Sequence, residues 1–495
     1  MSGAGKMQSG SALRQTVVRR LLARSGFARR WFRLPSDDSY DPERNARIVA
    51  KVKARVFGER DASTLSSEAS PLELLRRSYG QHLCQMEAMN SRLVRYLQNA
   101  VAAVALLPCI LWWLGRYVQG RMERGAAERP VVIAFDYAPF VRSFVEGLRP
   151  GVPVLWTKTR RAELSPGDLA FAFRLIVALP VCWLDFQFLL KVLFGIGSYS
   201  SLIRRYRPKE ILDFHEHFAP VSLQTAYCRS KGVRHVNVMH GHRAPVADFS
   251  FATFDQFYVW GEHYKEVFTS VCCPRDQFTV AGNPMHQSLL HKREAEPVSG
   301  RPKPRLLVCY EPVLGASPAY LELLVRLVSQ LPENWSVALR CRAPRAHEHT
   351  TGESFAQVLD GRLRELGRMP VQVERELEKS LEDSIAAAGA LVGIYSTSLL
   401  DGWVAGRKVI RLRSKVDPFC VPADPYSGSA NVLTYDEETF LGDFLAKESS
   451  FDHTEREMLN RISYQAAPQE RSTGDGTGMA ILSVADDVRA GSREV

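Results

Sequence analysis

The chain has 495 residues, of which 45% are hydrophobic and 24% charged, a composition typical of a folded rather than a disordered protein. This length predicts two or three domains, each with enough residues for a core of its own. The nine cysteines are odd in number and include no Cys-x-x-Cys pair, which argues against a zinc site and against a disulfide framework. We therefore expect no metal centre, and a reducing compartment, the cytoplasm.

The net charge of +10 is concentrated near the start of the chain, where every charged residue from Met1 to Pro35 is basic. Leucines and valines recur among these residues at helical spacing, and Phe27, Trp31 and Phe32 follow. The pattern predicts a basic amphipathic helix on an anionic membrane surface. It fits equally a disordered basic arm or a helix packed on the protein body. No nucleic-acid-binding motif accompanies the charge, so we expect no nucleic-acid partner.

Two apolar stretches follow. The first, Ala100 to Gly115, is slightly shorter than the ~20 residues that span a bilayer, and it contains Pro108. We expect a re-entrant or interfacial hairpin there, with a true span as the alternative. The second, Phe171 to Gly197, carries three charged residues, which favours helices that are buried in a domain or dip into the membrane interface. With no secretory signal near Met1, residues 1–125 are predicted to be a membrane-associating helical extension at the inner face of the cytoplasmic membrane.

From Pro130 the pattern changes to short apolar runs that alternate with helical stretches, of which Val221 to Lys231 is the clearest. Such alternation predicts a parallel sheet whose strand ends face a ligand crevice. The predicted strands are Val131–Phe135, Val152–Trp156, Pro208–His215, Val233–Met239, Phe257–Trp260 and Phe278–Ala281.

The strand that ends at Met239 is followed by the turn His240-Gly241-His242. A glycine lets the backbone bend and approach a ligand closely, and imidazoles titrate near neutral pH. Asp136 and Glu216 follow other strands of the same predicted sheet, so their carboxylates should face the same crevice. Each of these residues also fits a role without a ligand, as a solvated loop residue, a helix cap or half of an ion pair. For Asp136 we favour a cap or an ion pair.

A polar, proline-rich linker at 293–304 precedes a second α/β unit. Its predicted strands are Arg305–Tyr310, Trp335–Leu339, Ala390–Ile394 and Lys408–Leu412, and its predicted helices are Pro318–Gln330, Leu377–Ala388 and Leu399–Ala405. We therefore predict an α/β fold with two Rossmann-like domains that face a cleft, at 126–297 and 298–440, followed by C-terminal helices and a tail at 441–495.

Hydroxylated residues mark the end of one strand in this second domain. Ser396, Thr397 and Ser398 precede a short helix, where hydroxyls, backbone N–H groups and the helix dipole would form a cradle for phosphate. A plain serine N-cap explains one of the hydroxyls without a ligand. Arg340 and Arg342 leave a neighbouring strand and would pair with the same phosphates, or lie in a solvated loop.

The order of several short motifs resembles a known group of enzymes. Met-His240-Gly, Val-Trp-Gly-Glu, Val-Ala-Gly282-Asn283-Pro and Ile-Tyr-Ser396-Thr-Ser follow one another between residues 130 and 440. This series resembles bacterial GT-B enzymes of surface-polymer synthesis, namely the CDP-glycerol glycerophosphotransferases and the capsular polysaccharide and polysialic acid transferases. The chain departs from their His-Gly-Thr-Pro motif after Gly241, and Arg340-Cys-Arg-Ala-Pro stands where sialyltransferase-like members have Lys-x-His-Pro.

The resemblance implies a transferase that moves a sugar or polyol phosphate from a nucleotide-activated donor to a hydroxyl of a polysaccharide or lipid-linked acceptor. His240 would be the base, with Glu216 and Asp136 in reserve, while Gly241, His242, Gly282 and Asn283 would form acceptor-side or structural turns. The donor is a substrate, so no cofactor is expected. The sequence contains no Asp-x-Asp clamp, which favours metal-independent transfer, and one base without a covalent nucleophile favours an inverting displacement. The alternatives are a sugar-nucleotide epimerase of the same form and a non-catalytic assembly or export factor.

Overall fold

The computed structural model describes residues 41–58, 66–89, 92–122, 132–135, 139–157, 161–295, 304–311, 314–315, 317–341, 352–375, 378–415, 425–447 and 452–463. The basic segment 1–35, the candidate residues Asp136 and Arg342, and the tail after residue 463 lie outside these ranges.

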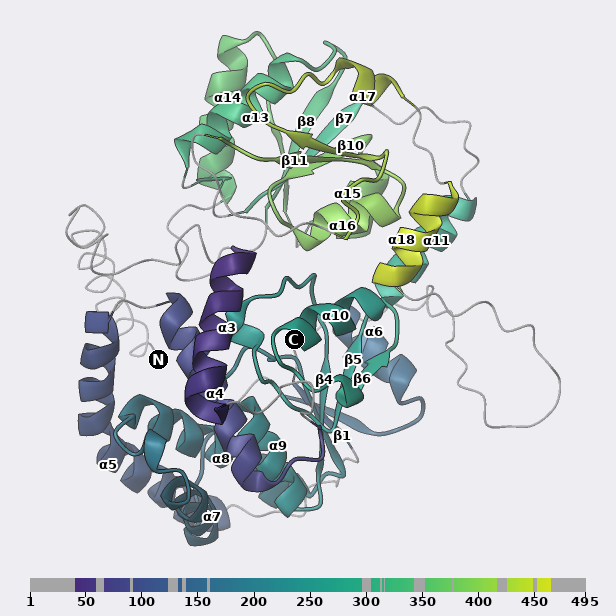
Figure 1. Ribbon diagram of the computed structural model, residues 1–495. Coiled ribbons are helices and arrows are strands. Elements are labelled where there is room, and N and C mark those ends of the chain that lie inside the picture. The colour runs from purple at the N-terminus through teal and green to yellow at the C-terminus, as the bar shows by residue number, and fades with distance from the viewer. Residues whose placement is uncertain are drawn as a thin grey trace, which may run out of the picture.

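A layer of helices occupies one side of the N-terminal half of the molecule (Figure 1). It contains α3 (Pro42–Phe57), α4 (Pro71–Met89), α5 (Arg92–Met122), α7 (Pro166–Val177), the short helix Pro180–Cys182 and α8 (Phe186–Tyr206). The expected hairpin at Ala100–Gly115 is wrong, because α5 is one continuous helix of 31 residues. Pro108 lies inside this helix, on its exposed side, and does not interrupt it.

The first sheet has six parallel strands in the order β2-β1-β3-β4-β5-β6. The strands are β1 (Val132–Phe135), β2 (Val154–Thr157), β3 (Glu210–Asp213), β4 (Arg234–Val238), β5 (Gln256–Val259) and β6 (Phe278–Val280). Helices α6 (Pro139–Leu148), α9 (Val221–Ser230), α10 (Glu262–Ser270) and α11 (Pro284–Ala295) connect or follow them. The strand order reverses between β1 and β3, which is where open α/β sheets bind ligands beyond the carboxyl ends of their strands.

The second sheet also has six parallel strands, in the order β12-β11-β10-β7-β8-β9. They are β7 (Arg305–Cys309), β8 (Ser336–Cys341), β9 (Gln372–Arg375), β10 (Ala390–Gly393), β11 (Lys408–Leu412) and β12 (Val432–Tyr435), with helices α13 (Pro318–Ser329), α14 (Gly352–Glu365), α15 (Leu381–Ala386) and α16 (Thr397–Val404). The predicted α/β class with two Rossmann-like, GT-B-like domains is confirmed. Two edge strands, β9 and β12, were not predicted.

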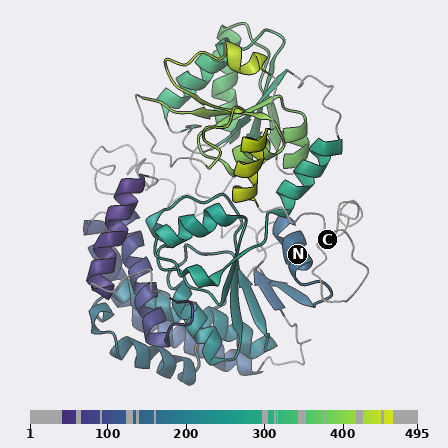
Figure 2. The same cartoon turned by 45° about the vertical axis from the view of Figure 1, so that its right-hand side comes forward.

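Two further helices follow the second sheet, α17 (Gly442–Ala446) and α18 (His453–Ile462), and α18 returns to the first domain. It lies between the two domains (Figures 1 and 2) and packs on α10. The crossing is tight, since a Cβ added at Gly261 would lie 2.3 Å from the carbonyl oxygen of Arg461. The α11–α16 contact adds a buried pair, in which His286 Nε2 is 3.0 Å from Asp401 Oδ1.

Gly261→Ala should therefore destabilise the protein, because the new methyl group collides with backbone that cannot rotate away. We expect a loss of about 1–3 kcal/mol, as for other overpacked sites. Gly361→Ala is the matched control, since its Cβ would meet nothing within 4 Å inside the exposed part of α14, and better helix propensity should there raise stability slightly. Thermal unfolding of both variants checks this, and an unchanged melting temperature for Gly261→Ala would contradict the tight crossing.

Candidate functional site

The predicted turn after β4 and the polar residues after β3 meet at one edge of the first sheet. His240 lies just beyond the end of β4 and Glu216 just beyond the end of β3. Because neighbouring parallel strands end at the same edge, the two side chains come together, with 3.9 Å between His240 Nδ1 and Glu216 Oε2. Both are enclosed: the His240 side chain is 6% exposed and that of Glu216 is 0% exposed.

Arg243, which the sequence did not single out, completes this cluster. Its Nε lies 2.5 Å from Glu216 Oε1, and its Nη2 donates to His240 Nε2 at 2.7 Å. A carboxylate enclosed this fully needs a charged partner, since an isolated buried charge is very costly. Glu216, Arg243 and His240 thus form one unit, which we call the His240 cluster.

The cluster fixes the protonation states of its members. Burial raises the pKa of Glu216, but the charge of Arg243, followed by that of His240, outweighs this effect and lowers the pKa to about 2. Burial and the Arg243 charge lower the pKa of His240 to about 3. At neutral pH the site therefore holds an ionised carboxylate, already paired, beside a neutral imidazole. The Nε2 of this imidazole accepts from Arg243, so the arginine holds both of its neighbours in the cluster.

A second imidazole at this edge is oriented by a buried acid. His215 Nδ1 is 2.7 Å from Asp213 Oδ1, a hydrogen bond in which the ring nitrogen donates. The other oxygen of Asp213 accepts from the Tyr199 hydroxyl at 2.5 Å. Asp213 is 1% exposed, whereas the His215 side chain is 30% exposed. The sequence placed His215 at a strand end. It gave no sign of the hydrogen bond from Tyr199 of α8 that holds Asp213 in position.

The hydroxylated turn of the second domain lies against the His-Gly-His turn. Ser396 is the N-cap of α16, because its Oγ accepts from the N–H of Ser398 at 3.3 Å. Thr397 Oγ1 accepts from the backbone N–H of His242 at 3.2 Å. The His242 ring is also held, with Nδ1 2.8 Å from the Tyr264 hydroxyl. The hydroxylated turn of the second domain and the His-Gly-His turn of the first, which were predicted to face each other across the cleft, are therefore in contact at Thr397.

Glu311 is a further residue that sequence reasoning missed. It follows β7, next to β10, and the order of the second sheet reverses between these two strands. Its carboxylate accepts from the N–H groups of Tyr395 at 2.9 Å and Ile394 at 3.2 Å. The acid thus holds the backbone that leads directly into Ser396 and Thr397.

Other predicted residues have structural partners. The Arg340 guanidinium donates to the carbonyl of Lys379 at 3.1 Å and to Ser384 Oγ at 2.8 Å, so it braces the start of α15. Gly282 has a φ of 76°, in the left-handed region that favours glycine. Asn283 Oδ1 accepts from the N–H of Met285 at 3.1 Å, which closes the turn before α11. At Gly241 an added Cβ would meet no described protein atom closer than 3.7 Å, so its protein neighbours do not require a glycine there.

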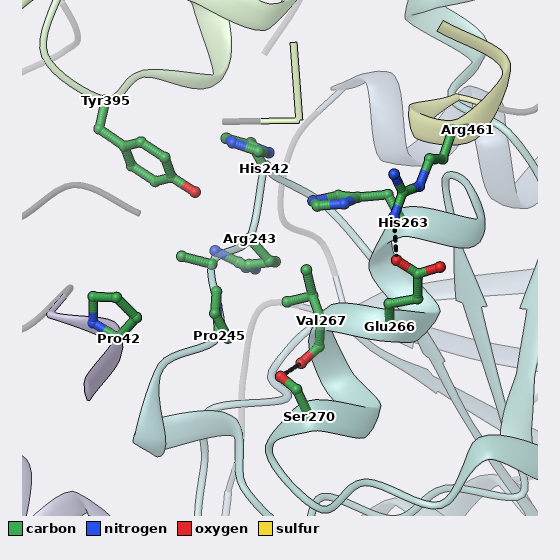
Figure 3. A pocket seen from close by; sticks show the side chains of 11 residues that line it. Pro42, His242, Arg243, Pro245, His263, Glu266, Val267, Ser270, Tyr395 and Arg461 are labelled. Atoms are coloured by element: carbon green, nitrogen blue, oxygen red, sulfur yellow. Dashed lines mark hydrogen bonds and ion pairs between the residues drawn. The ribbon is translucent and has the colours of Figure 1, made fainter. Parts of the chain in front are cut away.

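A cavity of about 390 Å³ opens beside the cluster, between the two domains. Figure 3 shows Tyr395 of the second domain with its hydroxyl pointing toward Arg243, and Pro42 of α3 on the same side. His263 and Arg461, with Arg461 paired to Glu266 at 2.5 Å, close the opposite side. Its lining carries more basic than acidic side chains, which suits an anionic ligand. Within the described ranges, no group of three His, Cys, Asp or Glu side chains could hold a metal ion.

Comparisons with known proteins give structural likeness only. No family model and no curated protein matches the sequence. The Methanocaldococcus jannaschii UDP-GlcNAc 2-epimerase, in complex with UDP-GlcNAc and UDP, is similar at 10% identity over 65% of this chain and 94% of that one, with a TM-score of 0.42. The wall teichoic acid polymerase TagF is similar at 10% identity over 76% and 94%, with a TM-score of 0.39. The glycotransferase of kitacinnamycin is similar at 15% identity over 68% and 94%, with a TM-score of 0.37. Values this low say nothing about activity.

The neutral state of His240 predicts how stability depends on pH. The unfolded chain binds a proton at this residue below about pH 6.5, whereas the folded protein does not until about pH 3. Stability should therefore fall as the pH drops below 6.5, with His240 contributing up to about 1.4 kcal/mol per pH unit. Below about pH 4.5 Glu216 lowers the stability further. The unfolded chain then takes up a proton at this residue, whereas the folded protein keeps the carboxylate ionised until about pH 2.

His240→Asn should make stability less dependent on pH between 6.5 and 4.5, as measured by urea unfolding across that window. His453→Asn, at a position whose side chain is 85% exposed, is the matched control and should leave the slope unchanged. If His240→Asn keeps the full slope of the parent protein, the imidazole is not held neutral.

Proposed function

We propose that the protein is a transferase that moves a sugar or polyol phosphate from a nucleotide-activated donor to an acceptor hydroxyl. The acceptor class we propose is a polysaccharide or lipid-linked chain. One observation carries the proposal: the turn that bears the neutral imidazole of His240 contacts, through the His242 N–H, the hydroxyl of Thr397 at the start of α16. A proton acceptor and a helix N-terminus with hydroxyls thus meet at the junction of two nucleotide-binding-type domains.

The donor wall would be the start of α16. The first N–H groups of a helix lack partners within the helix, and the helix dipole favours a negative charge beside them. Thr397 and Ser398 are half-buried there, so their hydroxyls add donors for a phosphate oxygen. Glu311 holds the backbone that precedes this helix by accepting from the N–H of Tyr395. Arg243 and Tyr395 line the neighbouring cavity.

The acceptor side would be the His240 cluster. In the transfer step, the acceptor O–H gives its proton to His240 Nε2 while its oxygen forms a bond to the transferred carbon or phosphorus. The bond between that atom and the nucleotide phosphate oxygen breaks, and the electron pair leaves with the phosphate. A positioned base contributes about 10²–10⁴-fold to such a step.

Arg243 has a part in this step, because it occupies the lone pair that the acceptor needs. An anionic donor in the cavity would attract the guanidinium away from the ring. The removal of that positive charge would raise the pKa of His240, since the Arg243 charge is one of the causes that lower it. The imidazole would then become a stronger base only when a donor is bound.

His215 is the second candidate for the base, and the Asp213–His215 hydrogen bond is the observation that favours it. A buried carboxylate that accepts from Nδ1 holds the ring in the tautomer whose Nε2 accepts protons. His215 is also more exposed than His240. The two assignments differ in which replacement removes the activity.

His240→Asn should lower turnover by about 10²–10⁴-fold, with a small change in the KM for the donor, because the base acts on the acceptor. His215→Asn is the matched comparison and should change turnover only a few fold. Transfer assays on both variants, with folding checked by circular dichroism, measure this. The reverse pattern would assign the base to His215. Full activity in both variants would contradict base catalysis at this edge, and turnover of a nucleotide-sugar without acceptor would indicate an epimerase.

Thr397→Val should weaken binding of the donor nucleotide, because it removes a hydroxyl from the proposed phosphate site. A nucleotide at a hundredfold excess over its Kd stabilises the folded protein by about 2.7 kcal/mol, which a thermal-shift screen detects. We expect the shift given by the best nucleotide to shrink in Thr397→Val but not in Thr279→Val, an exposed position on β6. Equal shifts in both variants would move the donor site away from α16.

A further inference from the structure

The outward face of α5 is apolar from Ala100 to Val118, where no exposed residue is polar. Soluble proteins normally turn the polar face of a surface helix to water. On α5 the exposed large side chains instead recur at helical spacing as one apolar stripe, with exposed fractions from 40% at Leu93 to 80% at Val104. The stripe, which we call the α5 face, comprises Leu93, Tyr96, Leu97, Val101, Val104, Leu107, Leu111, Trp112 and Val118.

Further exposed apolar side chains lie on α7 and on the segment that leads from it to α8. Phe173, Val177, Val181, Trp183 and Leu184 are 46–81% exposed there. Asn99 holds the end of this segment beside α5, since its Nδ2 donates to the carbonyl of Leu184 at 2.8 Å and its Oδ1 accepts from the N–H of Gln187 at 3.1 Å. Exposed apolar side chains gathered in this number indicate a binding face rather than an ordinary protein surface.

The opposite side of α5 is attached to the protein body. Trp113 is 8% exposed, its ring centroid lies 6.2 Å from that of Phe194 on α8, and its carbonyl accepts from the N–H of Leu164. Further along, the Arg204 guanidinium lies 4.6 Å from the centre of the Tyr117 ring. Residues 93–120 meet the length and hydropathy of a membrane span, but crossing a bilayer would break these contacts. The helix can instead lie flat with only its outer face in lipid.

The charges of α5 fit an anionic lipid surface. Residues 96–115 contain no charged side chain, which gives an uncharged length of about 30 Å. Arginines stand beyond both ends of this stretch, at 92, 95, 116 and 121, of which Arg95 is paired with Glu87. Tyr96, Trp112 and Trp183 are of the residue types that prefer the boundary between lipid and water. A second copy of the chain fits less well, because pairing two such faces in either direction would bring arginine-bearing ends together.

We propose that the α5 face is a docking surface for an anionic lipid bilayer, with α5 lying in the plane of the interface and the exposed apolar residues around Leu184 beside it. Apolar burial alone gives weak attachment, and basic residues add a second, electrostatic contribution. The basic segment 1–35 supplies further charge of the same sign. This inference goes beyond the proposed function and does not depend on which reaction the cleft performs.

Flotation of the full-length protein with phosphatidylcholine vesicles, with and without phosphatidylglycerol, tests the proposal. The parent protein should float with the anionic vesicles, and added salt should weaken its binding. Val104→Glu with Leu111→Glu should lower the partition coefficient about tenfold or more. Val358→Glu with Phe440→Glu is the matched control, since these apolar residues of the second domain are 53% and 79% exposed, and its binding should equal that of the parent.

Several results would overturn the proposal. They are no binding of the parent to either vesicle, equal binding by both double variants, and resistance of the bound protein to extraction at alkaline pH, which would indicate a true span. A parent dimer that Val104→Glu with Leu111→Glu converts to a monomer, without any vesicle binding, would assign the face to a second copy. Thermal unfolding checks that the variants fold, and their nucleotide-induced shifts report separately on the cleft.

Discussion

The buried charge of Glu216 is the constraint on which the candidate site depends. A carboxylate that is fully enclosed stays ionised only beside a partner, and Arg243 at 2.5 Å is that partner. Removing either member of such a pair typically costs 3–5 kcal/mol, because it leaves an uncompensated charge behind. The same arginine donates to His240, and burial together with the arginine's charge keeps the imidazole neutral. Glu216, which the sequence suggested as a reserve base, is therefore held in an ion pair with Arg243.

Contacts from both domains hold this arrangement in place. Thr397 meets the backbone of the His-Gly-His turn, and His286 pairs with Asp401 across the α11–α16 contact. Trp403 on α16 donates to Glu455 of α18, the helix that returns to the first domain. A ligand that binds in the cavity would act on the first of these contacts, because His242 lines that cavity. Any movement of Arg243 would then be coupled to donor binding.

The sequence predicts what depends on local pattern and misses what depends on distant pairing. Buried parallel strands are continuous apolar runs, so ten of the twelve strands were predicted close to their observed bounds. The edge strand β9, Gln-Val-Glu-Arg, has no such run. Pro108 suggested a break, but a proline on the exposed face of a long helix does not end it. Arg243 and Glu311 were missed because Glu216, the acid beside Arg243, follows β3, and the N–H groups that Glu311 accepts from follow β10. No spacing along the chain reveals these two relations.

The helical layer before the first sheet supports the site directly. From α4, Gln81 Nε2 donates to the carbonyl of Glu216 at 2.7 Å, and Gln85 donates to the carbonyl of His217. From α3, Asn45 Oδ1 accepts from the N–H of Ala247, on the segment that follows the His-Gly-His turn. The backbone that carries the His240 cluster is therefore braced by helices from the same layer as α5. If α5 docks on a bilayer, the cleft would be held at a fixed height and orientation above the lipid, which suits an acceptor attached to that membrane.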